Sequence, residues 1–156
     1  MNGEPTDWPD DGVILYDGVC VLCSGWVRFV AKRDARRRFR FTPIESTYGT
    51  ALAVALGIDP ADPDTNAVVF GGRAYRRSAA ALTVVSALPR WGWVRMFRFV
   101  PGPLRDWVYE RVARNRYRWF GRNDVCDLGG AKLADRVLTV WPDGDKISHP
   151  AIGVLP

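Results

Sequence analysis

Residues 14–29 read ILYDGVCVLCSGWVRF, and this stretch decides the fold because its periodicity changes in the middle. Residues 13–16 are apolar and bounded by turn residues, which predicts a buried strand. A turn follows at residues 17–18, and from Cys20 onward apolar residues recur at helical spacing. Cys20 and Cys23, spaced C-x-x-C, therefore fall where a strand passes into a helix. Three interpretations compete: a redox dithiol, half of a metal site, and two small buried residues.

The 156-residue chain is 47% hydrophobic, which suits one domain whose core needs no disulfide. Its first residues are acidic and rich in turn formers, unlike a signal peptide, and no window resembles a membrane span. We therefore expect a cytoplasmic protein. Three cysteines in that compartment favour catalytic or metal-binding use over structural disulfides.

The rest of the pattern predicts alternating helices and strands. Residues 39–41 alternate like a half-exposed strand, residues 67–70 form a third strand, and Gly71-Gly72 predicts a tight hairpin to a returning strand. The order is β-α-β-α-β-β-α with a helical C-terminal extension, which is that of the thioredoxin-like, glutaredoxin-type α/β core. After the first helix, further helices are predicted over residues 49–56, 79–88, 91–100 and 104–120, with Ser78 as the cap of the second of these.

A thiol in the first turn of a helix lies near backbone amides that lack partners within the helix, and the helix dipole adds partial positive charge. Both effects favour a thiolate, so the pKa of such a thiol falls below its free value of roughly 8.5. Cys20 begins the polar stripe of the helix, and we expect it to be the exposed, attacking thiol. Cys23 shares a stripe with Val27 and Val30, and we expect it to be buried and to resolve the mixed disulfide.

Asp17 lies three residues before Cys20, at the end of the first predicted strand. A carboxylate there could relay protons for Cys23 during resolution. It could also cap the helix or form an Asx-turn with Gly18, and spacing alone favours this structural role. A carboxylate too close to Cys20 would raise the pKa of that thiol, so the orientation of Asp17 matters.

These residues resemble the DCC family of thiol-disulfide oxidoreductase-like proteins, which is named for an Asp-Cys-Cys motif. The motif residues are Asp17, Cys20 and Cys23 in YDGVCVLC. The segments VRF, GGRAYRRSAAAL, VPGPLRDWVYE and ARNRYRWFGRNDVC also match in the family's order, so the likeness spans about residues 13–128. The resemblance implies a thioredoxin-like fold and a disulfide oxidoreductase activity, but no particular substrate.

One feature departs from the wider thioredoxin-like pattern. Such proteins usually place a cis-proline before the third strand, facing the dithiol, and its backbone pairs with bound peptide or glutathione. Here the matching position lies near residues 65–67, no proline stands next to Val68, and Pro63 comes too early. The absence leaves the mode of substrate binding open, but not the thiol chemistry.

Cys126, in NDVCDL, is the third cysteine. It is a candidate third redox thiol that pairs with Cys20, and equally a half-buried small residue. A zinc site would combine Cys20, Cys23, Cys126 and His149, but these residues lack the usual paired spacing of zinc ligands. We expect neither a metal nor an organic cofactor.

Residues 90–122 contain nine Arg against two acidic residues, a net charge of +7 in a chain whose total is +5. Arginines interleaved with aromatics in RVARNRYRWFGR could bind single-stranded nucleic acid or an acidic membrane surface. We favour the structural alternative, a helix whose aromatics pack onto the sheet while its arginines stay in solvent. Arg116 and Arg118 are candidate steering residues that attract acidic partners or anionic thiols to the dithiol.

The sequence thus predicts a flexible N-terminus over residues 1–12, a thioredoxin-like DCC domain with its helical extension over residues 13–128, and a tail over residues 129–156 that could form a hairpin. The predicted function is a thiol-disulfide oxidoreductase acting on a disulfide-containing protein or a low-molecular-weight thiol. The alternative is a non-catalytic thioredoxin-like binding module that uses its Arg/Trp-rich face.

Overall fold

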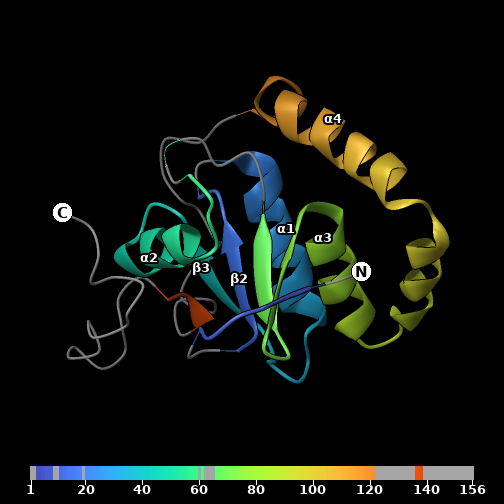
Figure 1. Cartoon of the computed structure of the whole chain (residues 1–156), viewed down its shortest axis with the longest axis horizontal. Coiled ribbons are helices and arrows are strands. Elements are labelled where there is room, and N and C mark those ends of the chain that lie inside the picture. Colours follow the sequence, from blue (N-terminus) through green and yellow to red (C-terminus); the bar gives the residue numbers. More distant parts are fainter. Residues whose placement is uncertain are drawn as a thin grey trace.

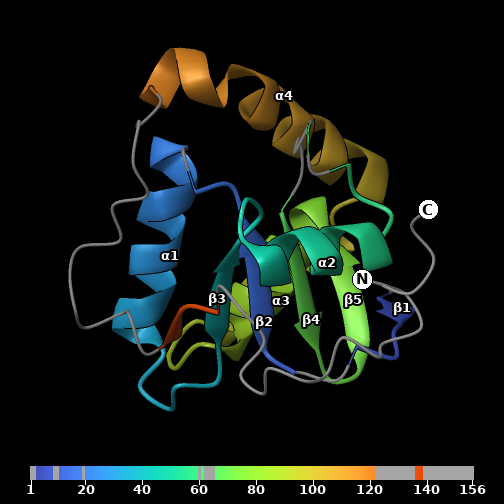
Figure 2. The ribbon, with the colours of Figure 1, turned by 90° about the vertical axis from the view of Figure 1, so that its left-hand side faces the viewer.

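The computed structural model describes residues 3–8, 11–18, 20–59, 61, 66–121 and 136–138. Five strands form one mixed sheet in the order β1-β5-β4-β2-β3 (Figures 1 and 2). The strands are β1 (Glu4–Pro5), β2 (Val13–Tyr16), β3 (Arg40–Pro43), β4 (Ala67–Phe70) and β5 (Arg73–Arg76). The helices are α1 (Val21–Arg33), α2 (Thr47–Ala55), α3 (Arg77–Ala87), the 3-10 helix η1 (Gly92–Phe99) and α4 (Gly102–Phe120).

The interior strand β2, which pairs with β3 and β4, fixes the topology. It runs parallel to β3, with Ile14 opposite Phe41, and antiparallel to β4, with Ile14 opposite Val68. The β4–β5 hairpin turns at Gly71 and Gly72, whose φ angles of 63° and 71° are those that a two-residue turn of this kind requires. From β2 onward the element order is the predicted one, and the thioredoxin-like α/β fold with a helical extension is confirmed; strand β1 was not predicted.

Alternating residues of β2 supply two separate apolar layers, as expected for a strand buried on both faces. Val13 and Leu15 pack in the cluster that contains α2 residues, whereas Ile14 and Tyr16 pack in the cluster that contains α1 and α3 residues. Helix α2 thus covers one face of the sheet, and α1 and α3 cover the other (Figure 2). Both cysteines belong to the second layer.

The helical extension lies at the end of the sheet rather than on a face. Figure 2 shows α4 crossing above the end of the sheet at which β2 terminates. Because α4 meets the rest of the molecule along only one side, Tyr117, Trp119 and Phe120 remain exposed and Arg116 is buried. The interpretation that the aromatics pack onto the sheet while the arginines stay in solvent is therefore wrong for this helix. None of the described helices is both long and apolar enough to cross a membrane.

The start of α3 also differs from the prediction. Helix α3 begins at Arg77, with Arg76 in the N-cap position, so Ser78 lies inside the helix and does not cap it. The Ser78 hydroxyl instead donates to Asp106 Oδ1 at 2.6 Å, which joins α3 to α4.

Both ends of the chain contribute to the sheet. Residues 4–5 form the edge strand β1, and the indole of Trp8 is buried and donates to the Tyr48 hydroxyl at 2.9 Å. Val137 forms a parallel bridge with Phe41 on the outer edge of β3. The buried Arg136 beside it donates to Asp34 Oδ2 at 2.5 Å. Apart from residues 136–138, the tail predicted to form a hairpin lies outside the described residues, so that prediction and the proposed domain boundaries remain untested.

Candidate active site

Cys20 occupies the N-cap position of α1, where the sequence placed it. Its backbone is extended, with φ −81° and ψ 123°, and its Sγ accepts a hydrogen bond from the Cys23 amide at 3.4 Å. No acidic residue lies in the first turn of α1, so no side chain of that turn offsets the partial positive charge of the helix at the thiol. Both cysteines are free thiols rather than a disulfide.

Both cysteines are buried, with exposed fractions of 0% for Cys20 and 3% for Cys23. The expectation of a buried Cys23 is confirmed, but the expectation of an exposed Cys20 is wrong. The Cys20 side chain turns back to cap α1 and packs in the same apolar layer as Cys23 and Val27. A large partner therefore cannot reach its sulfur in this conformation.

The two thiols have opposite acidities. A hydrogen bond from the Cys23 thiol is the largest influence on Cys20 and lowers its pKa to about 6, aided by the Cys23 amide and the charge of Arg116, and opposed by burial and by Asp17. The same hydrogen bond raises the pKa of Cys23, and burial raises it further. At neutral pH the pair is thus a Cys20 thiolate that accepts from a Cys23 thiol.

Asp17 is a buried carboxylate, with 3% of its surface exposed, directly after β2. Its Oδ2 accepts hydrogen bonds from Arg116 Nη2 at 3.2 Å and from the Tyr117 hydroxyl. The helix-capping role considered for Asp17 is wrong, because Cys20 itself is the N-cap of α1. Asp17 instead attaches α4 to the end of β2.

Glu45 follows β3, the parallel neighbour of β2, and lies next to Asp17. Its two carboxylate oxygens accept from the Gly18 amide at 3.2 and 3.3 Å. Burial raises the pKa of Glu45, and its hydrogen bond with Asp17 raises it further. Glu45 therefore keeps its proton to a higher pH than a free glutamate does. We call Asp17, Glu45, Arg116 and Tyr117 the Asp17 cluster.

Arg116 is a member of the site and not a surface charge. Only 5% of its surface is exposed, so the prediction that it steers partners from solvent is wrong. Burial alone would lower the pKa of Arg116, but its hydrogen bond with Tyr117 and the nearby negative groups outweigh this and raise it. Burial and the hydrogen bond to Asp17 raise the pKa of Tyr117. Arg118 is exposed, and its steering role stays a prediction.

Residues 14–122 match the family model of DCC1-like thiol-disulfide oxidoreductases. The chain belongs to this family. The DCC1-like chain is 38% identical over 127 residues to the uncharacterized protein YuxK of Bacillus subtilis, which covers 81% of this chain and 93% of that protein. It is 39% identical over 118 residues to a chloroplastic DCC family protein of Arabidopsis thaliana, covering 74% of this chain and 69% of that protein. No solved structure gives a significant match.

The family supports a thiol-disulfide oxidoreductase role and substrates that contain thiols or disulfides. The cytoplasmic location of this DCC1-like protein stays a prediction, because the name of one relative places that relative in the chloroplast. Cys126 and His149 lie outside the described residues. Among the residues that the structure describes, no group of three or more His, Cys, Asp or Glu side chains could hold a metal ion.

Three further residues of the DCC1-like site, Asn66, Tyr109 and Glu45, were not predicted as site residues, although Asn66 lies in the segment where the expected proline is missing. Asn66 stands just before β4, where other thioredoxin-like proteins have their proline, and its Oδ1 lies 4.0 Å from the Cys23 sulfur. The backbone amide of Asn66 donates to the hydroxyl of Tyr109, a residue of α4, at 2.9 Å. No peptide bond between described residues is cis. The element order could have indicated Glu45, since parallel β2 and β3 end at the same edge of the sheet.

Proposed function

We propose that this protein exchanges disulfides through Cys20 and Cys23, with Cys20 as the attacking thiolate. The observation that carries the proposal is the polarised pair at the start of α1, in which the Cys20 pKa falls to about 6 while the Cys23 pKa rises. A thiolate is the nucleophile in disulfide exchange, and this one is populated at neutral pH.

The reaction has two balanced steps. Cys20 attacks one sulfur of a substrate disulfide, forms a mixed disulfide, and releases the other sulfur as a thiolate that takes a proton from solvent. Cys23 then loses its proton and attacks the Cys20 sulfur, which releases the second substrate thiol and leaves a Cys20–Cys23 disulfide. The substrate gains two electrons and the dithiol loses two. A low-molecular-weight thiol returns the pair to the dithiol by the reverse exchange.

We infer that the Asp17 cluster assists the second step. Cys23 must give up a proton that burial and Cys20 hold tightly. We assign the acceptor role to Asp17, whose charge acts on both thiols, with Glu45 sharing the proton. The charge of Arg116 favours the thiolate form of each cysteine.

Access for a protein-sized disulfide requires α4 to move. Cys20 is fully buried, and the contacts of Asp17 with Arg116 and Tyr117 hold α4 across this end of the sheet. Opening these contacts is therefore part of the proposed cycle for any partner larger than the pocket beside Cys23.

The test uses the full chain with Cys126→Ser as the background, so that two thiols remain. With bis(2-hydroxyethyl) disulfide as the probe, intact-mass measurement should find one adduct on Cys23→Ser and none on Cys20→Ser. The parent should form an internal disulfide with no lasting adduct. An adduct that appears on Cys20→Ser as fast as on Cys23→Ser would reject the assigned roles.

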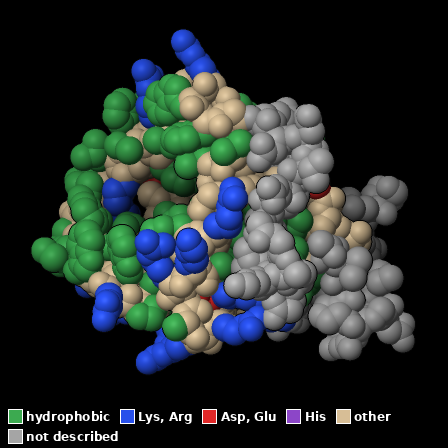
Figure 3. Space-filling model, turned by 180° about the vertical axis from the view of Figure 1, so that it is seen from behind, with side chains coloured by type: hydrophobic (Ala, Val, Ile, Leu, Met, Phe, Trp, Pro, Cys, Tyr) green, Lys and Arg blue, Asp and Glu red, His purple; other side chains and the backbone are tan. Residues whose placement is uncertain are grey.

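A second candidate function rests on the surface opposite α2. Seven of the exposed apolar side chains on η1 and α4 have exposed arginines beside them. Figure 3 shows hydrophobic side chains gathered over these elements among Lys and Arg. Aromatic side chains with arginines match the interfacial region of an anionic membrane in both polarity and charge. We propose this η1–α4 face as a docking surface for such a membrane. Its apolar residues are Trp93, Met96, Phe97, Phe99, Leu104, Trp107 and Val108.

Cosedimentation with vesicles tests this candidate. The protein should bind vesicles that contain phosphatidylserine and should not bind pure phosphatidylcholine. The double change Trp93→Ser and Phe99→Ser should abolish binding, whereas Val54→Ser, at an exposed apolar residue of α2, should leave it intact. Absence of binding to anionic vesicles at low ionic strength would exclude a membrane partner. Binding retained in Cys20→Ser would show that docking needs no dithiol.

A further inference from the structure

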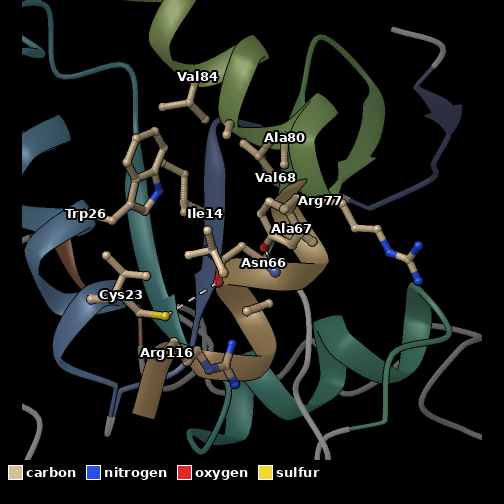
Figure 4. A pocket seen from close by; sticks show the side chains of 15 residues that line it. Ile14, Cys23, Trp26, Asn66, Ala67, Val68, Arg77, Ala80, Val84 and Arg116 are labelled. Atoms are coloured by element: carbon tan, nitrogen blue, oxygen red, sulfur yellow. Dashed lines mark hydrogen bonds between the residues drawn. The ribbon is translucent and has the colours of Figure 1, made fainter. Parts of the chain in front are cut away.

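An apolar pocket of about 170 Å³ lies between α1, α3, α4 and the sheet, and the Cys23 sulfur forms part of its wall (Figure 4). Trp26, Val68, Ala80, Val84 and Val112 supply apolar side chains from four different elements. In Figure 4 the Cys23 sulfur, Asn66 and Arg116 lie toward one end, whereas Trp26 and Val84 lie toward the other.

The volume and lining define what the pocket can hold. An apolar cavity of roughly 150 Å³ accepts a benzene molecule. A pocket of about 170 Å³ therefore suits one aromatic ring or a branched alkyl group of similar size. The polar atoms at the Cys23 end suit a ligand that carries its sulfur next to that apolar group.

The same wall disfavours an extended peptide. A bound peptide strand would pair with the backbone before β4, as in other edge-strand recognition. Here the Asn66 amide already donates to Tyr109 at 2.9 Å, and the Asn66 carbonyl accepts from the Arg77 amide at 3.2 Å. Both backbone groups of Asn66 are thus engaged within the fold, and the residues that engage them also line the pocket.

We propose that this pocket binds the apolar group of a low-molecular-weight thiol or disulfide and presents its sulfur to the dithiol at the Cys23 end. The inference rests on the proposed exchange for its chemistry and narrows the substrate to small molecules with a compact apolar group. Cys20 does not itself line the pocket, so its sulfur must turn toward the Cys23 end before the first attack. The electrons and protons then move as in the two steps above, and the small disulfide leaves as two thiols.

Binding is measured first, without reaction. Benzyl methyl sulfide cannot exchange, so it probes the pocket alone, and 2-(methylthio)ethanol is its polar counterpart. In protein labelled at alanine methyl groups, the benzyl compound should shift the signals of Ala80, Ala81 and Ala113 saturably, and the polar compound should not. Ala81→Phe should abolish the shifts by filling the pocket. Ala79→Phe, two residues earlier in α3 and not among the lining residues, should preserve them. Ala113→Leu is a second filling variant on α4.

Turnover is measured next with benzyl 2-hydroxyethyl disulfide against bis(2-hydroxyethyl) disulfide. We expect kcat/KM to favour the benzyl compound by about tenfold or more, and the preference to fall to about twofold or less in Ala81→Phe. Binding of the sulfide with no turnover of either disulfide would keep the pocket and reject the exchange function. Turnover of both disulfides with equal kcat/KM and no methyl shifts would overturn the pocket and keep the function.

Discussion

Arg116 donates a hydrogen bond to Asp17 with an N–O distance of 3.2 Å, although the two residues are 99 positions apart in the sequence. Asp17 directly follows the interior strand β2, and Arg116 lies near the C-terminal end of α4. Both side chains are buried, so the pair holds α4 over the dithiol as one unit with the core.

Arg116→Ala should destabilise the protein by about 3 kcal/mol, because it leaves the Asp17 carboxylate buried without its cation. The same change should speed modification of Cys20 by iodoacetamide, since of the two contacts of α4 with Asp17 only that of Tyr117 is left. Arg118→Ala, at an exposed position on the same helix, should change the free energy of unfolding by less than about 0.5 kcal/mol. Denaturant unfolding and alkylation rates check both effects, and equal behaviour of the two variants would contradict the attachment.

The Cys20 thiolate should titrate with a midpoint near pH 6, as followed by thiolate ultraviolet absorbance. Because the Cys23 thiol is the main cause, Cys23→Ala should move the midpoint toward the roughly 8.5 of a free thiol. Cys23→Ser keeps an O–H donor and should move it less. The measurement uses the Cys126→Ser background, and an unchanged midpoint in Cys23→Ala would rule out the thiol–thiolate hydrogen bond.

Stability should depend on pH through the same group. The Cys20 pKa is lower in the folded protein than in the unfolded chain, so the unfolded chain binds more protons between these values and stability rises with pH. We expect the free energy of unfolding to increase by about 2 kcal/mol from pH 6 to pH 8 relative to Cys20→Ser. Above the pKa of a free thiol the raised Cys23 pKa reverses the trend. Parallel slopes for the two proteins from pH 6 to pH 8 would refute this linkage.

Asp17→Asn should separate the two steps of the exchange. The charge of Asp17 raises the Cys20 pKa, so its removal should lower that pKa and leave the first attack at least as fast. Resolution by Cys23 should slow by about a hundredfold, as for loss of a general base, and the mixed disulfide should accumulate. Quenched-flow mass measurement checks this, with Glu45→Gln expected to give a smaller effect. Rapid resolution in Asp17→Asn would exclude Asp17 as the proton acceptor.

Gly49→Ala should destabilise the fold by more than about 2 kcal/mol, because a Cβ at this position of α2 would lie 1.9 Å from the Pro43 carbonyl oxygen. The matched control is Gly25→Ala in α1, where a Cβ would meet nothing within 4 Å. That change should stabilise the protein by about 0.5–1 kcal/mol through helix propensity. Thermal unfolding of the two variants checks the prediction, and a neutral Gly49→Ala would mean that α2 sits less closely on β3.

Local patterns were sufficient for the fold. The run of residues 13–16, the Gly71-Gly72 turn and the helical periods each depend on neighbours in the sequence, and the structure has all of them. The sequence predicts a helix over residues 91–100 but not that it is the 3-10 helix η1, because an apolar period with aromatic residues does not distinguish the two helix types. The early start of α2 follows from Ser46, whose Oγ accepts from the Gly49 amide at 2.9 Å.

The site was only partly predictable, because its other half comes from distant segments. The C-x-x-C spacing located Cys20 and Cys23, but the exposure of Cys20 depends on how its side chain turns and on the helix that crosses above. Arg116 looks like any arginine of a basic helix until α4 is placed against β2. Asn66 lies in the segment where the expected proline is missing, but Tyr109 carries no local signal, since its role arises from one hydrogen bond across 43 residues.

The bridge between Val137 and Phe41 has a consequence for solubility. Strand β3 is the last strand of the sheet, and an uncovered last strand offers its unpaired backbone groups to other molecules. A chain shortened to residues 1–128 would keep the whole Asp17 cluster. It would nevertheless expose the outer side of β3 and remove Arg136, the partner of Asp34. We expect such a fragment to aggregate through the exposed strand β3 while its dithiol is still reactive.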